Sequence, residues 1–157
     1  MREACIETEY PVSVRRDHTN HVNAWLEQAA KGLRSEQLLQ LSEIAMAALW
    51  KRAYLTLGEI TLVAITDRVL STTAEKFPPF KSLKVTPMGI DWRELREQHE
   101  VLGKRKLAEG IRFLMAEFMM VAGNLTAEVL RPALHTELLK VTPKHLASGG
   151  KQGERQS

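Results

Sequence analysis

One segment of this chain spaces its apolar side chains at alternating steps of four and three residues, and this pattern restricts the fold more than any other feature. Such a repeat is typical of a long helix that buries one face. The seam is too short for an isolated coiled coil, so it predicts either a core helix of a bundle or a dimer interface. It consists of Leu107, Ile111, Leu114, Phe118, Val121 and Leu125.

Helical patterns also occur on both sides of this segment. A first helix is expected over about residues 19–33, and a second, capped by Ser35, over about residues 35–54. Residues 92–102 form a highly charged helix, which predicts a position on the surface. Pro132 lies within the last helical pattern and predicts a kink or a restart there.

The stretch from residue 55 to residue 78 separates two architectures. Thr56 and Glu59 have the spacing of a capping box, which predicts a helix that begins at Leu57. A helix-turn-helix would need a second break near residues 64–66, but no Gly, Asn or Pro is present there. Because the first half of this helix is apolar on nearly every side, we expect one central, buried helix over residues 57–76.

Two segments have the alternation of β-strands. Residues 5–15 alternate β-branched or aromatic side chains with other types, and Pro11 makes an edge strand of this segment. Residues 81–87 contain the second alternating run, and we expect the two segments to pair as a small ribbon.

These patterns predict a mainly α fold: a single-domain helical bundle of about five to six helices, with a short N-terminal strand that pairs with a strand near residues 81–87. The 157 residues are enough for one domain with a real core. We expect the domain to cover residues 1–141. The polar, Gly- and Ser-containing residues 142–157 are expected to be a disordered tail.

Charge and hydropathy narrow the range of partners. The net charge is +3, and the tail carries two of these charges through Lys144, Lys151 and Arg155 against Glu154. The body is therefore nearly neutral, which does not favour nucleic acid as a partner. No apolar run approaches the ~20 residues of a membrane span, so we expect no membrane partner and a cytoplasmic location.

Specific catalytic motifs are missing from the sequence. It contains no phosphate-binding loop, dinucleotide-binding turn, nucleophile elbow or helical metalloprotease motif. Cys5 is the single cysteine, so neither an intrachain disulfide nor a cysteine-rich metal site can form. We therefore expect no catalytic residues and no cofactor.

Four ionisable residues lie within apolar helical patterns and are candidates for a site. Their simplest interpretation is ion pairing between packed helices, since a buried unpaired charge is costly. The alternative is a small polar pocket between helices that binds a ligand. The four are Asp67, Arg68, Arg112 and Glu117.

The histidines give weaker signals. His18 and His21 stand three residues apart beside Asp17, but two ligands do not make a metal site, and we interpret them as a solvated N-terminal turn. His135 resembles a phosphoacceptor only in being a helical histidine, because no proline follows it at the required short distance. We predict an ordinary helix-surface or interface histidine at that position, and no metal site.

The leading functional hypothesis is a non-catalytic regulatory or protein-interaction module that binds itself as a homodimer and another protein. Its expected interface comprises Leu107, Ile111, Leu114, Phe118 and Val121. The alternative is a winged-helix-type DNA-binding regulator, with three helices over residues 36–76 and a wing over residues 80–92. The third is a small-ligand sensor built on Asp67 and Glu117.

Overall fold

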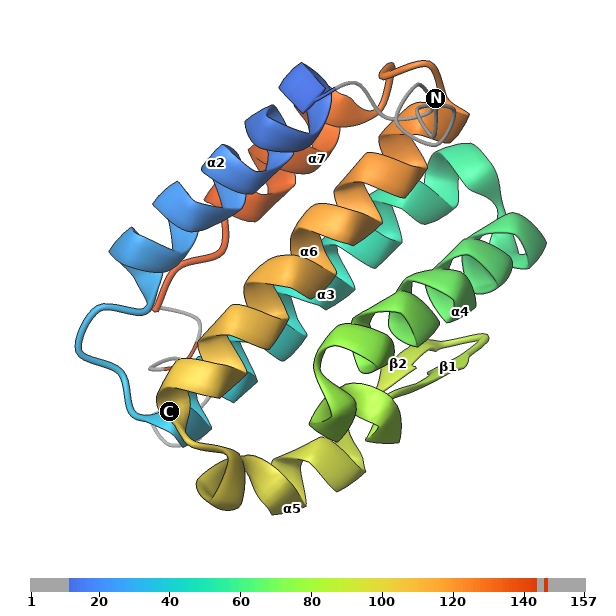
Figure 1. Ribbon diagram of the computed structural model, residues 1–157. Helices are drawn as coiled ribbons and strands as arrows, with labels where there is room; N and C mark the ends of the chain where they lie inside the picture. Colours follow the sequence, from blue (N-terminus) through green and yellow to red (C-terminus); the bar gives the residue numbers. More distant parts are fainter. Residues whose placement is uncertain (1–11, 144–145, 147–157) are drawn as a thin grey trace, which may run out of the picture.

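Helices form most of the chain that the structure describes, which is residues 12–143 and Leu146 of a computed structural model (Figure 1). Residues 1–11, most of the predicted tail and the N-terminal part of the predicted strand lie outside the described residues. In chain order the elements are α2 (Val12–Ala29), α3 (Ser35–Leu57), α4 (Glu59–Lys76), the 3-10 helix η1 (Pro78–Ser82), β1 (Lys84–Thr86), β2 (Gly89–Asp91), α5 (Arg93–Leu102), α6 (Lys104–Leu125) and α7 (Arg131–Leu139).

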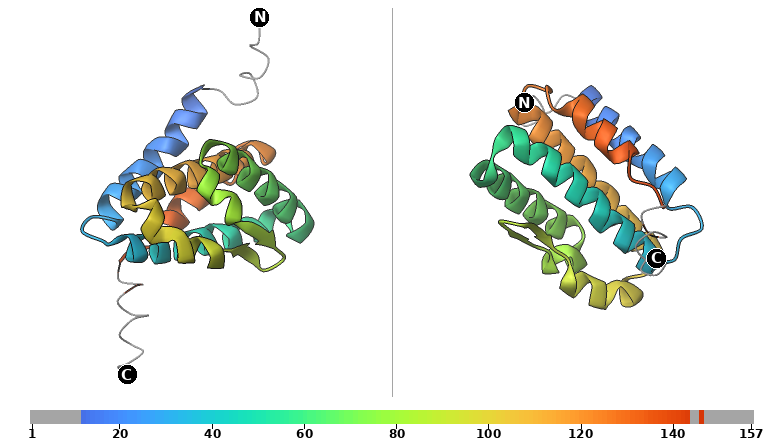
Figure 2. Two further views of the ribbon diagram at one scale, coloured as in Figure 1. Left: turned by 60° about the horizontal axis from the view of Figure 1, so that its bottom comes forward. Right: turned by 180° about the vertical axis from the view of Figure 1, so that it is seen from behind.

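The long helices pack in two layers. Helix α6 lies between α2 and α4 in one layer, and α3 lies behind it between α7 and the β-hairpin (Figures 1 and 2). Helix α5 crosses one end of the molecule. The indole Nε1 of Trp25 donates a hydrogen bond of 2.9 Å to the carbonyl oxygen of Val141, which ties α2 to the segment after α7. No helix in the described part of the chain is both long and apolar enough to cross a membrane.

The strand prediction is partly wrong. Residues 12–15 belong to helix α2, which begins seven residues earlier than the predicted helix and ends at Ala29 rather than near residue 33. A strand does form within residues 81–87, but its antiparallel partner is β2, with Val85 opposite Ile90. Strand β1 pairs with β2 rather than with the N-terminal segment because a tight turn brings β2 beside β1 with little loss of chain entropy. In that turn Thr86 Oγ1 donates to the carbonyl oxygen of Gly89.

The predicted capping box at Thr56 is also wrong. Thr56 lies in the last turn of α3, and the chain changes direction at Gly58, whose φ of +82° falls in the region that favours glycine. The amide of Gly58 donates to the carbonyl oxygen of Tyr54 and closes α3. Helix α4 then runs without a break to Lys76, which confirms the prediction of one helix and excludes a helix-turn-helix within residues 59–76.

Helix α4 is not the central helix that its composition suggested. Its side chains Leu62, Ile65 and Val69 face the core, whereas Ile60 is 86% exposed. The central positions belong to α3 and α6, whose apolar residues recur at helical spacing along their whole length. Apolar content on several sides of a helix therefore did not mean burial on every side.

Gly110 of α6 faces the Phe80 ring of η1. A Cβ atom at Gly110 would overlap Cε1 and Cζ of Phe80, which is 1% exposed. The absence of a side chain at this position leaves room for the Phe80 ring beside the helix.

We predict that Gly110→Ala destabilises the fold, although alanine normally favours a helix interior over glycine. Overpacking of this kind costs about 1–3 kcal/mol in the free energy of unfolding, which urea denaturation would measure. Adding Phe80→Leu should recover part of the loss because it removes the overlap. Strict additivity of the two single substitutions would contradict the contact.

Candidate functional site

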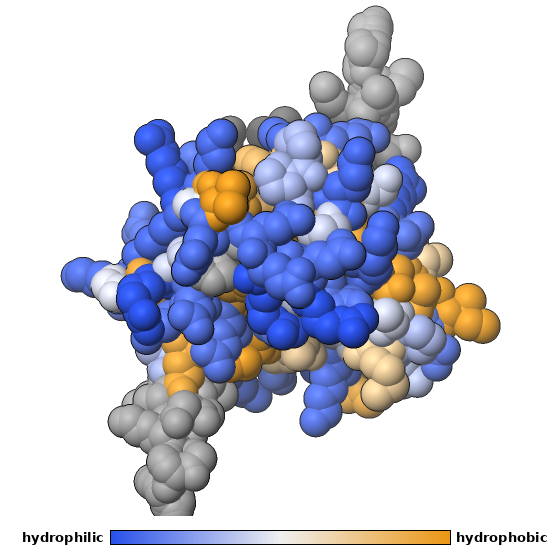
Figure 3. Space-filling view, turned by 90° about the horizontal axis from the view of Figure 1, so that it is seen from below, coloured by the Kyte–Doolittle hydropathy of each residue, from blue (hydrophilic) through white to orange (hydrophobic). Residues whose placement is uncertain are grey.

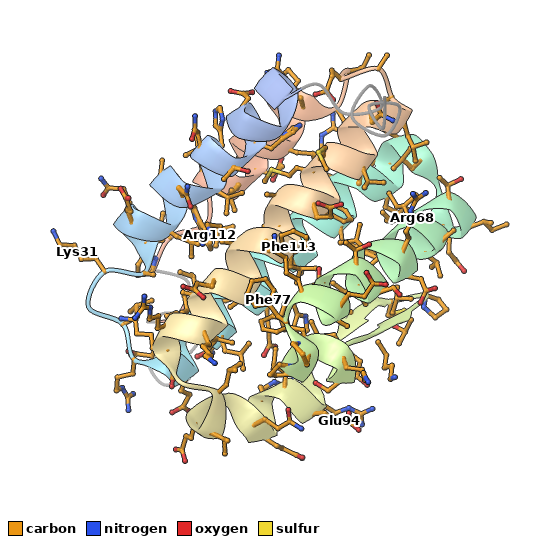
Figure 4. The ribbon with its side chains drawn as sticks, viewed as in Figure 1. Lys31, Arg68, Phe77, Glu94, Arg112 and Phe113 are labelled. Carbon is orange, nitrogen blue, oxygen red and sulfur yellow. The ribbon has the colours of Figure 1, made fainter. Side chains whose placement is uncertain are left out.

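The structure does not bring together the four ionisable residues predicted to form a polar cluster. Asp67 and Arg68 are exposed on α4, where Asp67 lines a groove beside β1 together with Lys81. Arg112 and Glu117 line a different groove next to α2. Figure 4 shows Arg68 and Arg112 on opposite sides of α6. These residues therefore do not share one pocket.

The apolar seam of α6 lies inside the chain rather than on its surface. Leu107, Ile111, Leu114 and Phe118 are completely buried and Val121 is 7% exposed, whereas Leu125 at the end of the seam is 53% exposed. Their partners are side chains of α2, α3 and α4 in the same chain. A surface for a second copy must therefore lie elsewhere in this conformation.

The chemically distinctive site is a cluster of three histidines where α2 meets α7. His18 is completely buried, and its Nδ1 lies 3.0 Å from Nε2 of His135. The other ring nitrogen of His18, Nε2, lies 3.4 Å from Oε1 of Glu128. Neither Nε2 of His18 nor Oε1 of Glu128 has a hydrogen-bond partner of ordinary geometry. A buried chain of carboxylate, imidazole and imidazole therefore runs from Glu128 to His135.

His21 and Asp17 extend this cluster toward the surface. The ring of His21 stacks on that of His135, with centroids 3.6 Å apart and an angle of 24° between the planes. Asp17 and His21 are four residues apart on α2 and so share one helix face. One ligand-type atom from each of Asp17, His21 and His135 lies within 4.8 Å of the other two.

Arg131, at the first turn of α7, connects the acidic groups of the cluster. Its Nη1 donates to Oδ2 of Asp17, and its Nε lies 3.6 Å from Oε1 of Glu128. The site thus contains two carboxylates and one permanent cation around three imidazoles, and its net charge is −1 when the imidazoles are neutral.

Burial favours the neutral ring at two of these histidines, His18 and His135. Burial, reinforced by the neighbouring His21 and His18, lowers the pKa of His135 to about 4. Burial also lowers the pKa of His18, although the Glu128 carboxylate acts in the opposite direction. For Asp17, burial opposes ionisation, but the hydrogen bond from Arg131 and the charge of His21 outweigh it, so its pKa lies below the usual range.

The turn between α6 and α7 holds Glu128 in place under strain. Ala127 and Glu128 have φ values of 52° and 66°, a left-handed conformation that costs about 1–2 kcal/mol per non-glycine residue. The Glu128 carboxylate packs against Gly123, where an added Cβ would lie 2.9 Å from Oε2. Leu130 N–H donates to Thr126 Oγ1 and closes the turn. Strain of this kind is often found at functional sites.

A second feature lies at the same end of the molecule, where the C-terminal ends of α3 and α6 meet (Figures 1 and 2). Among the described residues, five of the eight large hydrophobic side chains that are exposed lie at the C-terminal ends of α3 and α6, in the turn after α6, or in the first turn of α4. We call them the apolar end: Tyr54, Leu55, Ile60, Leu125 and Val129, with exposed fractions of 41%, 76%, 86%, 53% and 74%.

The face that carries α5 differs from this end. It is mostly hydrophilic, with several separate apolar patches (Figure 3).

Sequence reasoning placed the first helix too late and therefore missed the histidine cluster. Once α2 is extended backwards, His18 falls on the buried stripe formed by Val22, Trp25 and Ala29, at the same helical spacing. That stripe is the signal that would have identified His18 as buried. The pairing of His18 with His135, 117 residues later, has no signal in the sequence.

Comparison with known proteins identifies no family: no family model matches this chain, and no curated protein and no solved structure shows significant similarity to it.

Proposed function

We propose that this chain is a non-catalytic regulatory module that associates with itself, and that the apolar end is its interface. The observation that carries this proposal is the exposure of Leu55 and Ile60, two large aliphatic side chains that flank the corner at Gly58. Gathered apolar surface of this kind marks protein interaction sites on folded proteins. The apolar end therefore takes the place of the α6 seam as the proposed interface, because the seam packs within the chain.

One feature of the site supports a regulatory role over a catalytic one. The turn at residues 126–130 contributes Val129 to the apolar end and Glu128 to the histidine cluster. A change of charge at the cluster can therefore reach the interface through a short, strained segment. The DNA-binding alternative is less well supported, because residues 36–76 form two helices rather than the three that a winged helix requires.

We predict that Leu55→Glu/Ile60→Glu weakens self-association at least about tenfold, as expected from losing the burial of two aliphatic side chains per copy. Sedimentation velocity over a wide concentration range would measure the dissociation constant. The fold should be unaffected, because both side chains are exposed.

The matched control is Met88→Glu/Val101→Glu. These two side chains are each 91% exposed but lie on the hairpin turn and on α5, away from the apolar end. They should leave the dissociation constant unchanged. A wild-type chain that stays monomeric at every concentration, or equal weakening by both double variants, would refute the proposed interface.

A further inference from the structure

The hydrogen bonds of the histidine cluster determine where its lone pairs lie. The Nδ1 atom of His21 is 3.1 Å from the backbone carbonyl oxygen of Asp17. A carbonyl oxygen can only accept, so Nδ1 carries the hydrogen of the neutral ring and Nε2 keeps its lone pair. Nε2 is thus the nitrogen of His21 that is free to act as a ligand.

The same reasoning applies to His135 by way of His18. Because the Glu128 carboxylate faces Nε2 of His18, the favourable tautomer places the hydrogen on that nitrogen. Nδ1 of His18 then accepts from Nε2–H of His135 over 3.0 Å, and the lone pair of His135 is left on its Nδ1. Metal-binding histidines typically donate their second N–H in this manner, to a group that orients the ring.

The three outer groups of the cluster have the donor types and the spacing of a metal site. Their ligand-type atoms lie within 4.8 Å of one another, and in a tetrahedral site with bonds of about 2.0–2.1 Å they would lie about 3.3 Å apart. Rotation of the partly exposed Asp17 and His21 side chains toward His135 can close that difference. Two imidazoles and one carboxylate suit Zn²⁺ and its neighbours among the transition metals, and not Mg²⁺ or Ca²⁺.

We propose that Asp17, His21 and His135 bind one divalent transition-metal ion, with Zn²⁺ as the best fit. Three protein ligands leave the fourth position of a tetrahedral ion open to water or to a group on a partner. His18 and Glu128 form the supporting shell that orients His135. The completely buried His18, whose Nδ1 lies 3.0 Å from Nε2 of His135, is the second observation that distinguishes this cluster from a chance grouping, because it orients a ligand ring.

Arg131 acts as the internal competitor for this ion. Its guanidinium group holds Asp17 and places a positive charge beside the three ligands. It stabilises the Asp17 carboxylate when no metal ion is bound. When a metal ion approaches, the positive charge of Arg131 repels it. Removal of this charge should therefore tighten binding, the opposite of what removal of a ligand does.

The test is titration of the full chain with Zn²⁺, by calorimetry and by native mass spectrometry, after treatment with a chelator. Wild type should take up one ion per chain. His21→Gln and Asp17→Asn should each weaken binding at least about tenfold, Glu128→Gln should weaken it by roughly 10–100-fold through the supporting shell, and Arg131→Gln should tighten it about tenfold. Glu27→Gln, an exposed acidic position on the same helix, should bind as wild type does.

Several results would overturn the assignment. The first is that the wild type takes up no Zn²⁺. The second is that His21→Gln and Asp17→Asn bind Zn²⁺ as the wild type does, and the third is that Arg131→Gln binds it more weakly. His21 is partly exposed, so its variant should fold even if a variant of the buried His135 does not. Co²⁺ provides a second readout, since a four-coordinate site absorbs strongly in the visible range and His21→Gln should lose that absorption. The Leu55→Glu/Ile60→Glu variant should bind Zn²⁺ normally, which separates this proposal from the proposed interface.

Discussion

Phe118→Ala should lower the free energy of unfolding by about 3–5 kcal/mol, a large part of the stability of an ordinary domain. Phe118 lies on α6 and is completely buried within its own chain. The truncation removes an aromatic ring from the core and leaves a cavity that neighbouring side chains fill only in part. Urea denaturation followed by circular dichroism would measure the loss.

The same experiment separates a core residue from an interface residue. If Phe118 packs within one chain, the loss in stability should not depend on protein concentration, whereas removal of a dimer contact would make it do so. The matched control is Leu125→Ala, in the same helix and the same sequence repeat but 53% exposed. We expect this control to change stability by less than about 1 kcal/mol. Equal losses at both positions would contradict the burial pattern of α6.

The histidine cluster should make the fold sensitive to acid. In the folded chain the pKa of His135 is lowered to about 4, compared with 6.5 for an ordinary imidazole, and the pKa of His18 is lowered as well. Between these two pH values the unfolded chain binds more protons than the folded chain. The free energy of unfolding is therefore highest above about pH 6.5 and falls as the pH decreases toward about 4. The contribution of His135 to this loss is at most about 3 kcal/mol.

Urea denaturation at about pH 7.5 and about pH 4.5, with a chelator present, would measure the effect. His135→Gln removes the group that titrates while keeping a polar side chain of moderate size. The difference in stability between the two pH values should therefore be smaller in this variant than in the wild type. Glu43 has a raised pKa because of its burial, but it contributes equally to both proteins and cancels in the comparison. An unchanged difference would show that His135 titrates normally.

The length and type of the main helices could be predicted from the sequence because the signals are local. The repeat of apolar residues along α6, the pattern of α3 and the uninterrupted course of α4 were all confirmed. Pro132 marked a restart, and it occupies the first turn of α7. Each of these signals concerns residues within one or two helical turns of one another, where backbone geometry alone fixes which side chains share a face.

Errors arose where a local signal had more than one solution. Thr56 and Glu59 have the spacing of a capping box, but a glycine with positive φ at position 58 made a sharper helix boundary. Residues 12–15 alternate like a strand, yet they extend α2, because the strand near residue 84 pairs with its immediate neighbour instead. In each case two local structures fitted the same sequence pattern. The packing of the whole chain decided which of the two formed.

By itself the sequence determined the helical class, most helix boundaries within a few residues and the apolar face of α6. Only the tertiary structure decided what that face packs against, which apolar side chains remain at the surface, and that His18 and His135 meet. Helical periodicity is set by backbone geometry and can be read within a segment. The contact between α2 and α7 depends on how two layers of helices pack. Neither segment contains a local sequence pattern that predicts this contact.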